Sequence, residues 1–307
     1  HRVEPDCPYY GRCGGCDFRH MDRTEELAAK RQRVQDALRR IGGSAVTVEG
    51  IDGGAPLHYR NKSQYPVAAD GSVGFYKARS HQVIPVERCR IQKPQADAAA
   101  QTLRTYLRLY GVSCYDEKTR RGLVRYLYVR TNGAGQSLLC VLVNGKKLPH
   151  ERELVDLLRQ AVPETVGVVL GVNTRPTGAV LGQEYRTLWG ADVLTDTLCG
   201  LTFRLSVPSF YQVNREMAEV LYRRAVEFAG LTGTETVLDL YCGTGTITQV
   251  MARHAGRVIG AEIVPEAIED ARANAQRNGV ENVEFFCGDA AAAAADFARR
   301  GLRPDVI

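Results

Sequence analysis

The pattern of apolar and polar residues divides the chain into two regions of different character. Up to about residue 205, short strand-like runs alternate irregularly with three helical segments. From residue 206 the order becomes helix, strand, glycine loop, helix, strand, helix, strand, which is typical of a parallel, doubly wound sheet. We therefore predict a mixed α+β domain over residues 1–205 and a Rossmann-like α/β domain over residues 206–307, with the boundary near residues 205 to 210.

The first predicted helix runs from Asp22 to Ile41. Asp22 and Glu25 form a capping-box pair, apolar residues recur at helical spacing, and glycines follow its end. Its apolar face is a candidate surface for packing on the second domain. Its other face is rich in arginine and lysine, which we interpret as a solvated face rather than an RNA contact.

Further elements follow from periodicity and turn residues. Residues 44 to 90 are predicted as short strands broken by turns, and the stretch from residue 173 to 205 as hairpins. Asn132-Gly133 is predicted to turn between two paired strands. The predicted helices are Pro94–Leu109 and Glu151–Ala161, and the predicted strands are Leu123–Arg130, Ser137–Asn144 and Val166–Val172.

Composition narrows the class of protein. The 307 residues are 44% hydrophobic and 24% charged, as in ordinary globular proteins. No apolar run approaches the length of a membrane span, and nine cysteines without a secretory signal favour a reducing compartment, so we expect a soluble, cytoplasmic, monomeric protein. The net charge of +5 permits nucleic-acid binding without establishing it. Because the chain begins at His1 and stops at Ile307 inside a predicted strand, we expect it to be part of a longer protein.

Four cysteines form the most informative pattern of the first region. Cys7, Cys13 and Cys16 have the spacing C-x5-C-x2-C, and Cys89 follows much later. Glycines between Cys13 and Cys16 let the backbone fold back so that the thiols point at one centre. Four thiolates suit either tetrahedral zinc or a four-iron cluster, and the spacing does not separate the two. Disulfides are the less favoured alternative in a chain of this size without a signal peptide.

The second region carries a candidate nucleotide site. The buried strand Thr236–Leu240 runs into a glycine loop, residues 241–246, and then into a helix over Ile247–His254. A glycine turn at the carboxyl end of a first strand is where α/β folds bind nucleotides. Gly243 and Gly245 let a ligand approach the backbone closely. A role for these glycines in the tight turn alone is the simpler alternative.

The residues after the next two strands favour S-adenosylmethionine over NAD. Thr248 stands where a dinucleotide fold would carry a third glycine. Glu262, after the strand Arg257–Ala261, is placed to accept from ribose hydroxyls, and Asp289, after Val283–Phe286, from the amine of an adenine. Together with Asp239 at the end of the first strand, this order of motifs is typical of a methyl-donor site. Cys242 lies in the loop, and we interpret it as a small packing residue rather than a nucleophile.

Together these motifs resemble the RNA 5-methyluridine methyltransferases. The resemblance rests on C-x5-C-G-G-C with a distant fourth cysteine, on Ser209–Asn214 and on Asp239–Thr246. The segments Arg60–Tyr65 and Gly74–His81 are similar to central segments of that family. The resemblance covers residues 7 to 307, and it implies a cytoplasmic enzyme that modifies RNA.

The resemblance also implies specific site residues. The four cysteines, Cys7, Cys13, Cys16 and Cys89, would hold a [4Fe–4S] cluster. S-adenosylmethionine would contact Gln212, Tyr241, Gly243, Gly245, Glu262 and Asp289. RNA, with 23S ribosomal RNA favoured over transfer RNA, would lie near Asn61, Lys62, Arg79 and His81.

The implied reaction is methylation of C5 of a uridine. A cysteine thiolate adds to C6, the resulting enolate takes the methyl group, and a base removes the C5 proton. In the family both groups follow an Asp-Pro-Pro motif that would begin beyond Ile307, so the resemblance implies no catalytic residue within this chain and predicts that it is inactive alone. The alternatives are a non-catalytic iron–sulfur protein that binds RNA, a transfer-RNA methyltransferase, and a zinc-containing NAD enzyme.

Overall fold

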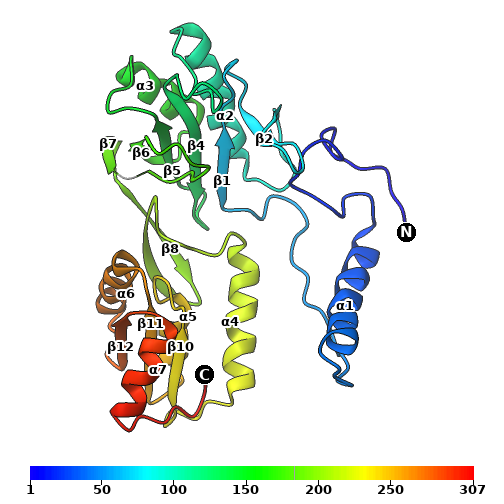
Figure 1. The fold of residues 1–307 in the computed structure, drawn as a ribbon, viewed down its shortest axis with the longest axis vertical. Helices are drawn as coiled ribbons and strands as arrows, with labels where there is room; N and C mark the ends of the chain where they lie inside the picture. The colour runs from blue at the N-terminus through cyan, green and yellow to red at the C-terminus, as the bar shows by residue number, and fades with distance from the viewer. Residues whose placement is uncertain (183) are drawn as a thin grey trace. The chain divides into compact units, whose positions relative to one another are not determined.

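The computed structural model describes residues 1–182 and 184–307, which form two compact units (Figure 1). Each unit is assembled from separate stretches of the chain. The first consists of His1–Val129, Val141–Pro163 and Leu170–Glu184, and the second of Arg130–Cys140, Glu164–Val169 and Tyr185–Ile307. Residues 185–205 thus group with the later part of the chain, whereas the sequence pattern placed the boundary near residues 205 to 210.

The first helix, α1 (Arg23–Arg40), begins as predicted, because the Asp22 side chain accepts the backbone N–H of Glu25 at 2.8 Å. None of its residues is buried. The predicted strands over residues 44–61 are absent from the described structure, where the first strand begins at Lys62. Near its start the backbone binds the side chain of Gln35 at Val46 and Val48, and near its end Arg60 forms only an isolated parallel bridge to Gln92.

A five-stranded sheet has the order β1-β4-β5-β6-β7. Its strands are β1 (Lys62–Pro66), β4 (Val124–Thr131), β5 (Ser137–Val143), β6 (Thr165–Val172) and β7 (Glu184–Gly190). Strands β4 and β5 are buried at every position, and β4 buries Arg125 and Arg130 together with its apolar residues. Helices α2 (Pro94–Leu109) and α3 (Glu151–Ala161) form as predicted. A separate antiparallel hairpin pairs β2 (Gly74–Tyr76) with β3 (Val83–Pro85).

The second unit contains a parallel sheet of order β10-β11-β12, as the alternating pattern predicted. Val306 forms a parallel bridge to Val237 of β10. Its strands are β10 (Thr236–Leu240), β11 (Arg257–Glu262) and β12 (Val283–Cys287), and its helices are α4 (Arg215–Ala229), α5 (Thr246–Ala252), α6 (Pro265–Arg277) and α7 (Ala290–Arg299).

An antiparallel hairpin of β8 (Val193–Leu198) and β9 (Leu201–Ser206) belongs to this unit. Its apolar residues share one core cluster with Tyr222 of α4 and Val250 of α5, which explains why the hairpin groups with this unit. Among the described residues, no helix has both the length and the apolar character needed to cross a membrane.

Candidate functional site

Three residues of the glycine loop after β10 adopt the left-handed backbone conformation, which residues other than glycine rarely adopt. Tyr241, Gly243 and Gly245 all have positive φ, at 65°, 56° and 72°. A Cβ on Gly245 would lie 3.0 Å from the ring of Phe285, so this glycine serves close packing. A Cβ on Gly243 would meet no atom within 4 Å, so its backbone faces open space that a ligand can enter. Tyr241 is 76% exposed beside it.

Glu262 joins the glycine loop to the end of β11. One carboxylate oxygen accepts the N–H of Gly243 at 3.1 Å, and the other accepts those of Ile263 and Val264 at 2.9 and 3.0 Å. These three bonds fix the orientation of the carboxylate. Each carboxylate oxygen can accept more than one bond, so this side chain keeps acceptor capacity for a diol.

The segment before α4 lies against the same loop. The Thr244 hydroxyl donates to the carbonyl of Phe210 at 3.4 Å, two residues before the half-buried Gln212. Tyr211 is buried between them and donates to Asp196 of β8 at 3.1 Å. The structure therefore brings the Gln212 segment, the glycine loop and Glu262 together at the carboxyl end of the parallel sheet, where α/β folds bind nucleotides.

Asp289 has a structural task at this edge. Its side chain accepts the N–H of Ala292 at 2.8 Å and caps α7. Gly288, just before it, donates its N–H to the carbonyl of Glu262 at 2.9 Å. Asp289 therefore begins α7 next to the end of β11, and one of its two oxygens is engaged by the helix.

Burial raises the pKa of two groups at this site, Asp239 at the end of β10 and Cys242 in the loop. The pKa of Asp239 is raised to about 6, chiefly because burial disfavours its charge, while a bond from Thr248 opposes the shift. Burial raises the pKa of Cys242 to about 12. Cys242 packs with Ile268, Ala271 and Phe285 in an apolar cluster, which confirms its prediction as a packing residue.

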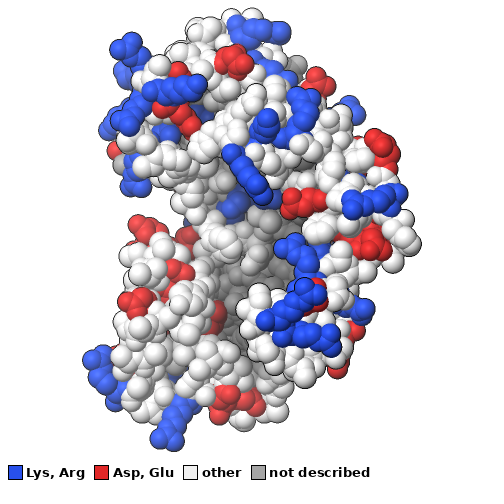
Figure 2. Space-filling model, turned by 45° about the vertical axis from the view of Figure 1, so that its right-hand side comes forward, with Lys and Arg blue, Asp and Glu red and all other residues white. Residues whose placement is uncertain are grey.

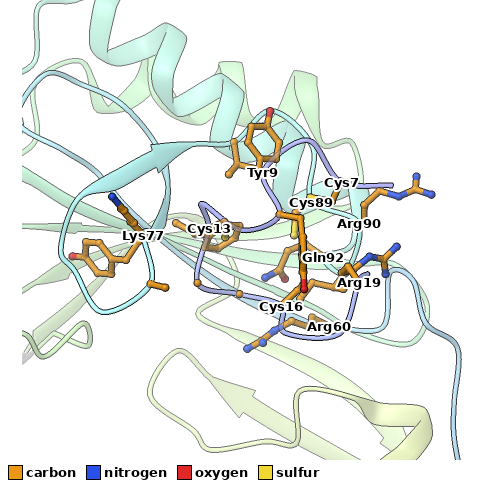
Figure 3. A pocket seen from close by; sticks show the side chains of 18 of the residues that line it. Cys7, Tyr9, Cys13, Cys16, Arg19, Arg60, Lys77, Cys89, Arg90 and Gln92 are labelled. Carbon is orange, nitrogen blue, oxygen red and sulfur yellow. The ribbon is translucent and has the colours of Figure 1, made fainter. Parts of the chain in front are cut away.

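The first unit contains the four predicted cysteines around one cavity. Cys7, Cys13, Cys16 and Cys89 all line a cavity of about 630 Å³ (Figure 3). Burial raises the pKa of Cys16 to about 11. Within the described residues, no group of three or more His, Cys, Asp or Glu side chains is placed to hold a metal ion.

Side chains that the sequence did not single out connect the cysteine segments. Asp6 accepts from Arg90 and from Arg19, each at 2.9 Å, and the bond from Arg19 is the main cause that lowers the Asp6 pKa. Tyr9 accepts the N–H of Glu87 at 3.0 Å. Asp97 accepts the N–H of Cys89 at 2.9 Å. The Tyr9–Glu87 and Asp6–Arg90 pairs join residues 78 and 84 positions apart, so no local pattern in the sequence predicts them.

Three of the four predicted RNA residues line the same cavity. They are Lys62 on β1 and Arg79 and His81 in the loop after β2. The His81 ring stacks on Tyr76 at 5.0 Å between centroids, and its Nδ1 lies 2.7 Å from Glu117. The fourth residue, Asn61, is only 6% exposed and belongs to the interior.

Basic residues are otherwise dispersed. On the face shown in Figure 2, Lys and Arg stand in several groups with acidic side chains among them. The net charge therefore does not locate an RNA surface by itself. The cavity is a more specific candidate for RNA binding than the dispersed surface charge, because Arg60 and Lys77 line it together with Lys62 and Arg79.

Comparisons with known proteins agree with this arrangement. A family model described as a methyltransferase domain matches residues 231–302. The chain is 41% identical over its whole length to an uncharacterized RNA methyltransferase of Clostridium tetani and to one of Halalkalibacterium halodurans, and it covers 68% of each. Among solved structures, the fold is similar to that of the Pyrococcus abyssi tRNA (uracil-54, C5)-methyltransferase in complex with S-adenosyl-L-homocysteine. That match has a TM-score of 0.75 at 22% identity and covers 91% of this chain and 66% of the other.

Proposed function

Because this chain belongs to the family of RNA methyltransferases, we propose that it acts in the S-adenosylmethionine-dependent methylation of C5 of a uridine in RNA. The observation that carries the proposal is the match of the whole chain to RNA methyltransferases, on a fold like that of a uracil-C5 enzyme. The chain spans about two thirds of the length of these relatives, and the proposed activity is that of the whole protein.

The cofactor site of this proposal is the carboxyl edge of the β10–β12 sheet. Glu262, oriented by three backbone N–H groups, binds the ribose diol. The open backbone at Gly243 lets the cofactor approach the loop, and the exposed side chain of Tyr241 in the same loop is free to contact it. The residues proposed to contact S-adenosylmethionine are Gln212, Tyr241, Gly243, Gly245, Glu262 and Asp289.

The chemistry explains which further groups the enzyme needs. Uracil C5 is a weak nucleophile, so a thiolate adds to C6 and makes an enolate whose C5 attacks the sulfonium methyl. A base then takes the C5 proton, and elimination of the thiolate from C6 restores the uracil ring. The target base must leave its stack for this reaction. We assign neither the nucleophile nor the base to a residue between 1 and 307.

For the cysteine cavity we propose a [4Fe–4S] cluster held by Cys7, Cys13, Cys16 and Cys89. The donor set fits, because four thiolates on one cavity are the ligands such a cluster requires. Four thiolates would suit tetrahedral zinc as well, and the resemblance to the RNA 5-methyluridine methyltransferases is what favours the cluster. We infer a structural role, since methyl transfer involves no redox step.

The cluster proposal is tested by iron analysis of protein purified without oxygen. We expect iron and sulfide together with an absorbance band near 400 nm, which zinc does not give. Cys13→Ala should lose iron and soluble yield together, whereas Cys114→Ala, at a cysteine outside the cavity, should lose neither. Full iron content in the Cys13 variant would contradict the assignment.

As substrate we propose 23S ribosomal RNA, with transfer RNA as the alternative. The resemblance of the Tyr65-Pro66 and Gly74–Tyr76 segments to the ribosomal-RNA enzymes supports this choice. The similar solved structure is named for a transfer-RNA substrate, and the relatives are named for RNA alone.

The function is tested by mapping 5-methyluridine in ribosomal and transfer RNA from a strain that lacks the gene. Loss of the modification from one position in 23S RNA, restored by the intact gene, is the expected result. Loss from transfer RNA would select the alternative substrate. An unchanged pattern in both RNA classes would favour a protein that binds RNA without modifying it.

A further inference from the structure

The cysteine loop, residues 7–16, is joined to the β2–β3 hairpin through the main chain. Cys13 and Lys77 form an antiparallel bridge, and the N–H of Gly14 donates to the carbonyl of Tyr76 at 3.0 Å. The loop therefore pairs with the chain at the end of β2 through one isolated bridge and one further backbone hydrogen bond. Figure 3 shows Cys13 and Lys77 on these two segments, and both residues line the cavity.

Gly14 is the residue that permits this approach. A Cβ at this position would lie 3.1 Å from the Cα and 3.2 Å from the nitrogen of Ala78. Both are backbone atoms, which cannot rotate away as a flexible side chain would. The neighbouring Gly15 differs, because a Cβ there would meet only the sulfur of Cys13 at an ordinary 3.4 Å. Two adjacent glycines thus have different structural requirements.

The pairing holds the turn that follows β2. This hairpin tip, residues 77–82, is closed by bonds from the N–H of Lys77 to the carbonyl of Gln82 and from the N–H of Gln82 to the Ser80 hydroxyl, both at 2.8 Å. The tip carries Lys77, Arg79 and His81, all exposed. Tyr76 is fixed twice, since its carbonyl accepts from Gly14 and its ring stacks on His81.

We propose that the cysteine loop is the positioning element of the hairpin tip and that Gly14 is its positioning residue. Pairing at Gly14 fixes the main chain from Tyr76 to Ala78, and so directs the cationic side chains of the tip toward RNA phosphates. The inference rests on the proposed function and extends its RNA-binding part. Affinity for RNA depends on the docked cysteine loop, whereas binding of the methyl donor in the other unit does not.

The test compares Gly14→Ala and Gly14→Val with the matched control Gly15→Ala in the full-length protein. Three quantities are measured: affinity for a 23S ribosomal RNA transcript made in vitro, affinity for S-adenosylhomocysteine, and hydrogen exchange of the Gly14 and Lys77 amides. Loss of one or two phosphate contacts weakens binding about tenfold at moderate salt and lowers the slope of log affinity against log salt by about one per contact.

The expected result is graded. Gly14→Val should bind the transcript at least about tenfold more weakly, with a smaller salt slope and faster exchange at Lys77, and Gly14→Ala should fall between it and the parent. Gly15→Ala should match the parent. All variants should bind S-adenosylhomocysteine equally well, which a general loss of folding would not allow.

Other outcomes overturn the inference in distinguishable ways. Parental RNA affinity and parental Lys77 protection in Gly14→Val would show that docking does not position the tip. An equal loss in Gly15→Ala would assign the effect to the cysteine centre instead of to the Gly14 contact. If the parent binds S-adenosylhomocysteine but no RNA transcript, the proposed function fails, and the inference fails with it.

Discussion

Glu262 shows how a single residue prepares a site before any ligand arrives. Its carboxylate is held by three backbone N–H groups from two segments, the glycine loop and the end of β11. A side chain fixed in this way loses little conformational entropy when it binds a diol. Sequence identified Glu262 from its place after a strand. The three bonds that orient it depend on the exact backbone of the loop, which the sequence did not specify.

We expect Glu262→Ala to weaken binding of S-adenosylhomocysteine at least about tenfold. Two hydrogen bonds to a charged acceptor contribute roughly 1.5–3 kcal/mol each, and about 1.4 kcal/mol corresponds to a factor of ten. Gln212→Ala should weaken binding less, because a neutral amide contributes less than a carboxylate. Calorimetric titration measures both. Unchanged affinity in a folded Glu262 variant would show that the cofactor binds elsewhere.

The raised pKa of Asp239 makes the stability of the folded protein depend on pH. Its pKa is raised to about 6 in the folded protein from an ordinary value of 3.8, so the folded state binds the proton more tightly than the unfolded state. Between those values the free energy of unfolding falls as pH rises, and above pH 6 the charged, half-buried carboxylate costs about 1–3 kcal/mol.

Asp239→Asn removes this titration while its amide oxygen can still accept from Thr248. We therefore expect the variant to gain stability relative to the parent at pH 7.5 and not at pH 4.5, as measured by denaturant unfolding at the two values. A difference between variant and parent that is the same at both pH values would contradict the burial argument.

At the scale of elements, local periodicity predicted most of the fold. The strand Thr236–Leu240 and the helices Pro94–Leu109 and Glu151–Ala161 form with the predicted bounds, because their apolar spacing and terminal residues are local properties. The β8–β9 hairpin was harder to place. Its strands were expected, but their attachment to α4 and α5 depends on a core cluster that includes Phe203 and Tyr222, which no local pattern encodes.

Other features depended on distant partners in the same way. Residues 44–61 have a turn-rich, strand-like sequence, yet the segment forms no strand, and Val46 and Val48 bind the side chain of Gln35 instead. The link through Asp6 between Arg19 and Arg90 likewise joins segments far apart in the chain. The cysteine spacing was visible in sequence, whereas the pairing of Gly14 with Tyr76 was not.

The N-terminal cap of α4 lies next to Gln212, one of the residues proposed to contact the cofactor. Asn214 caps this helix by accepting the N–H of Met217 at 3.2 Å, two residues after Gln212. Asn214→Ala should lower the stability of the protein by about 1 kcal/mol and weaken S-adenosylhomocysteine binding slightly, since the cap fixes the direction of the Gln212 segment. Asn214→Ser should restore both, because serine is also a good cap. Failure of serine to restore stability in thermal unfolding would argue against capping as the cause.

At the scale of the whole molecule, the question is whether any of the nine cysteines can act as the nucleophile of the proposed reaction. Uracil C5 methylation needs a thiolate that reaches C6 of an extruded base. Four of the nine cysteines line the cavity of the first unit. Cys140 is fully buried, and burial raises the pKa of Cys114 to about 11 and that of Cys242 to about 12, so these thiols are poor nucleophiles at neutral pH. Burial also raises the pKa of Cys199.

We therefore expect residues 1–307 alone to transfer no labelled methyl from S-adenosylmethionine to unmodified 23S RNA, while the full-length protein does so. Loss of the thiolate removes the covalent route to an activated C5, and binding alone cannot replace it. Turnover by residues 1–307 would show that a nucleophile lies within them. Cys287 would then be the first candidate, because it is exposed at the end of β12, opposite Glu262 in the strand register. In that case Cys287→Ser should abolish transfer, and Cys199→Ser, at a half-buried cysteine, should leave it unchanged.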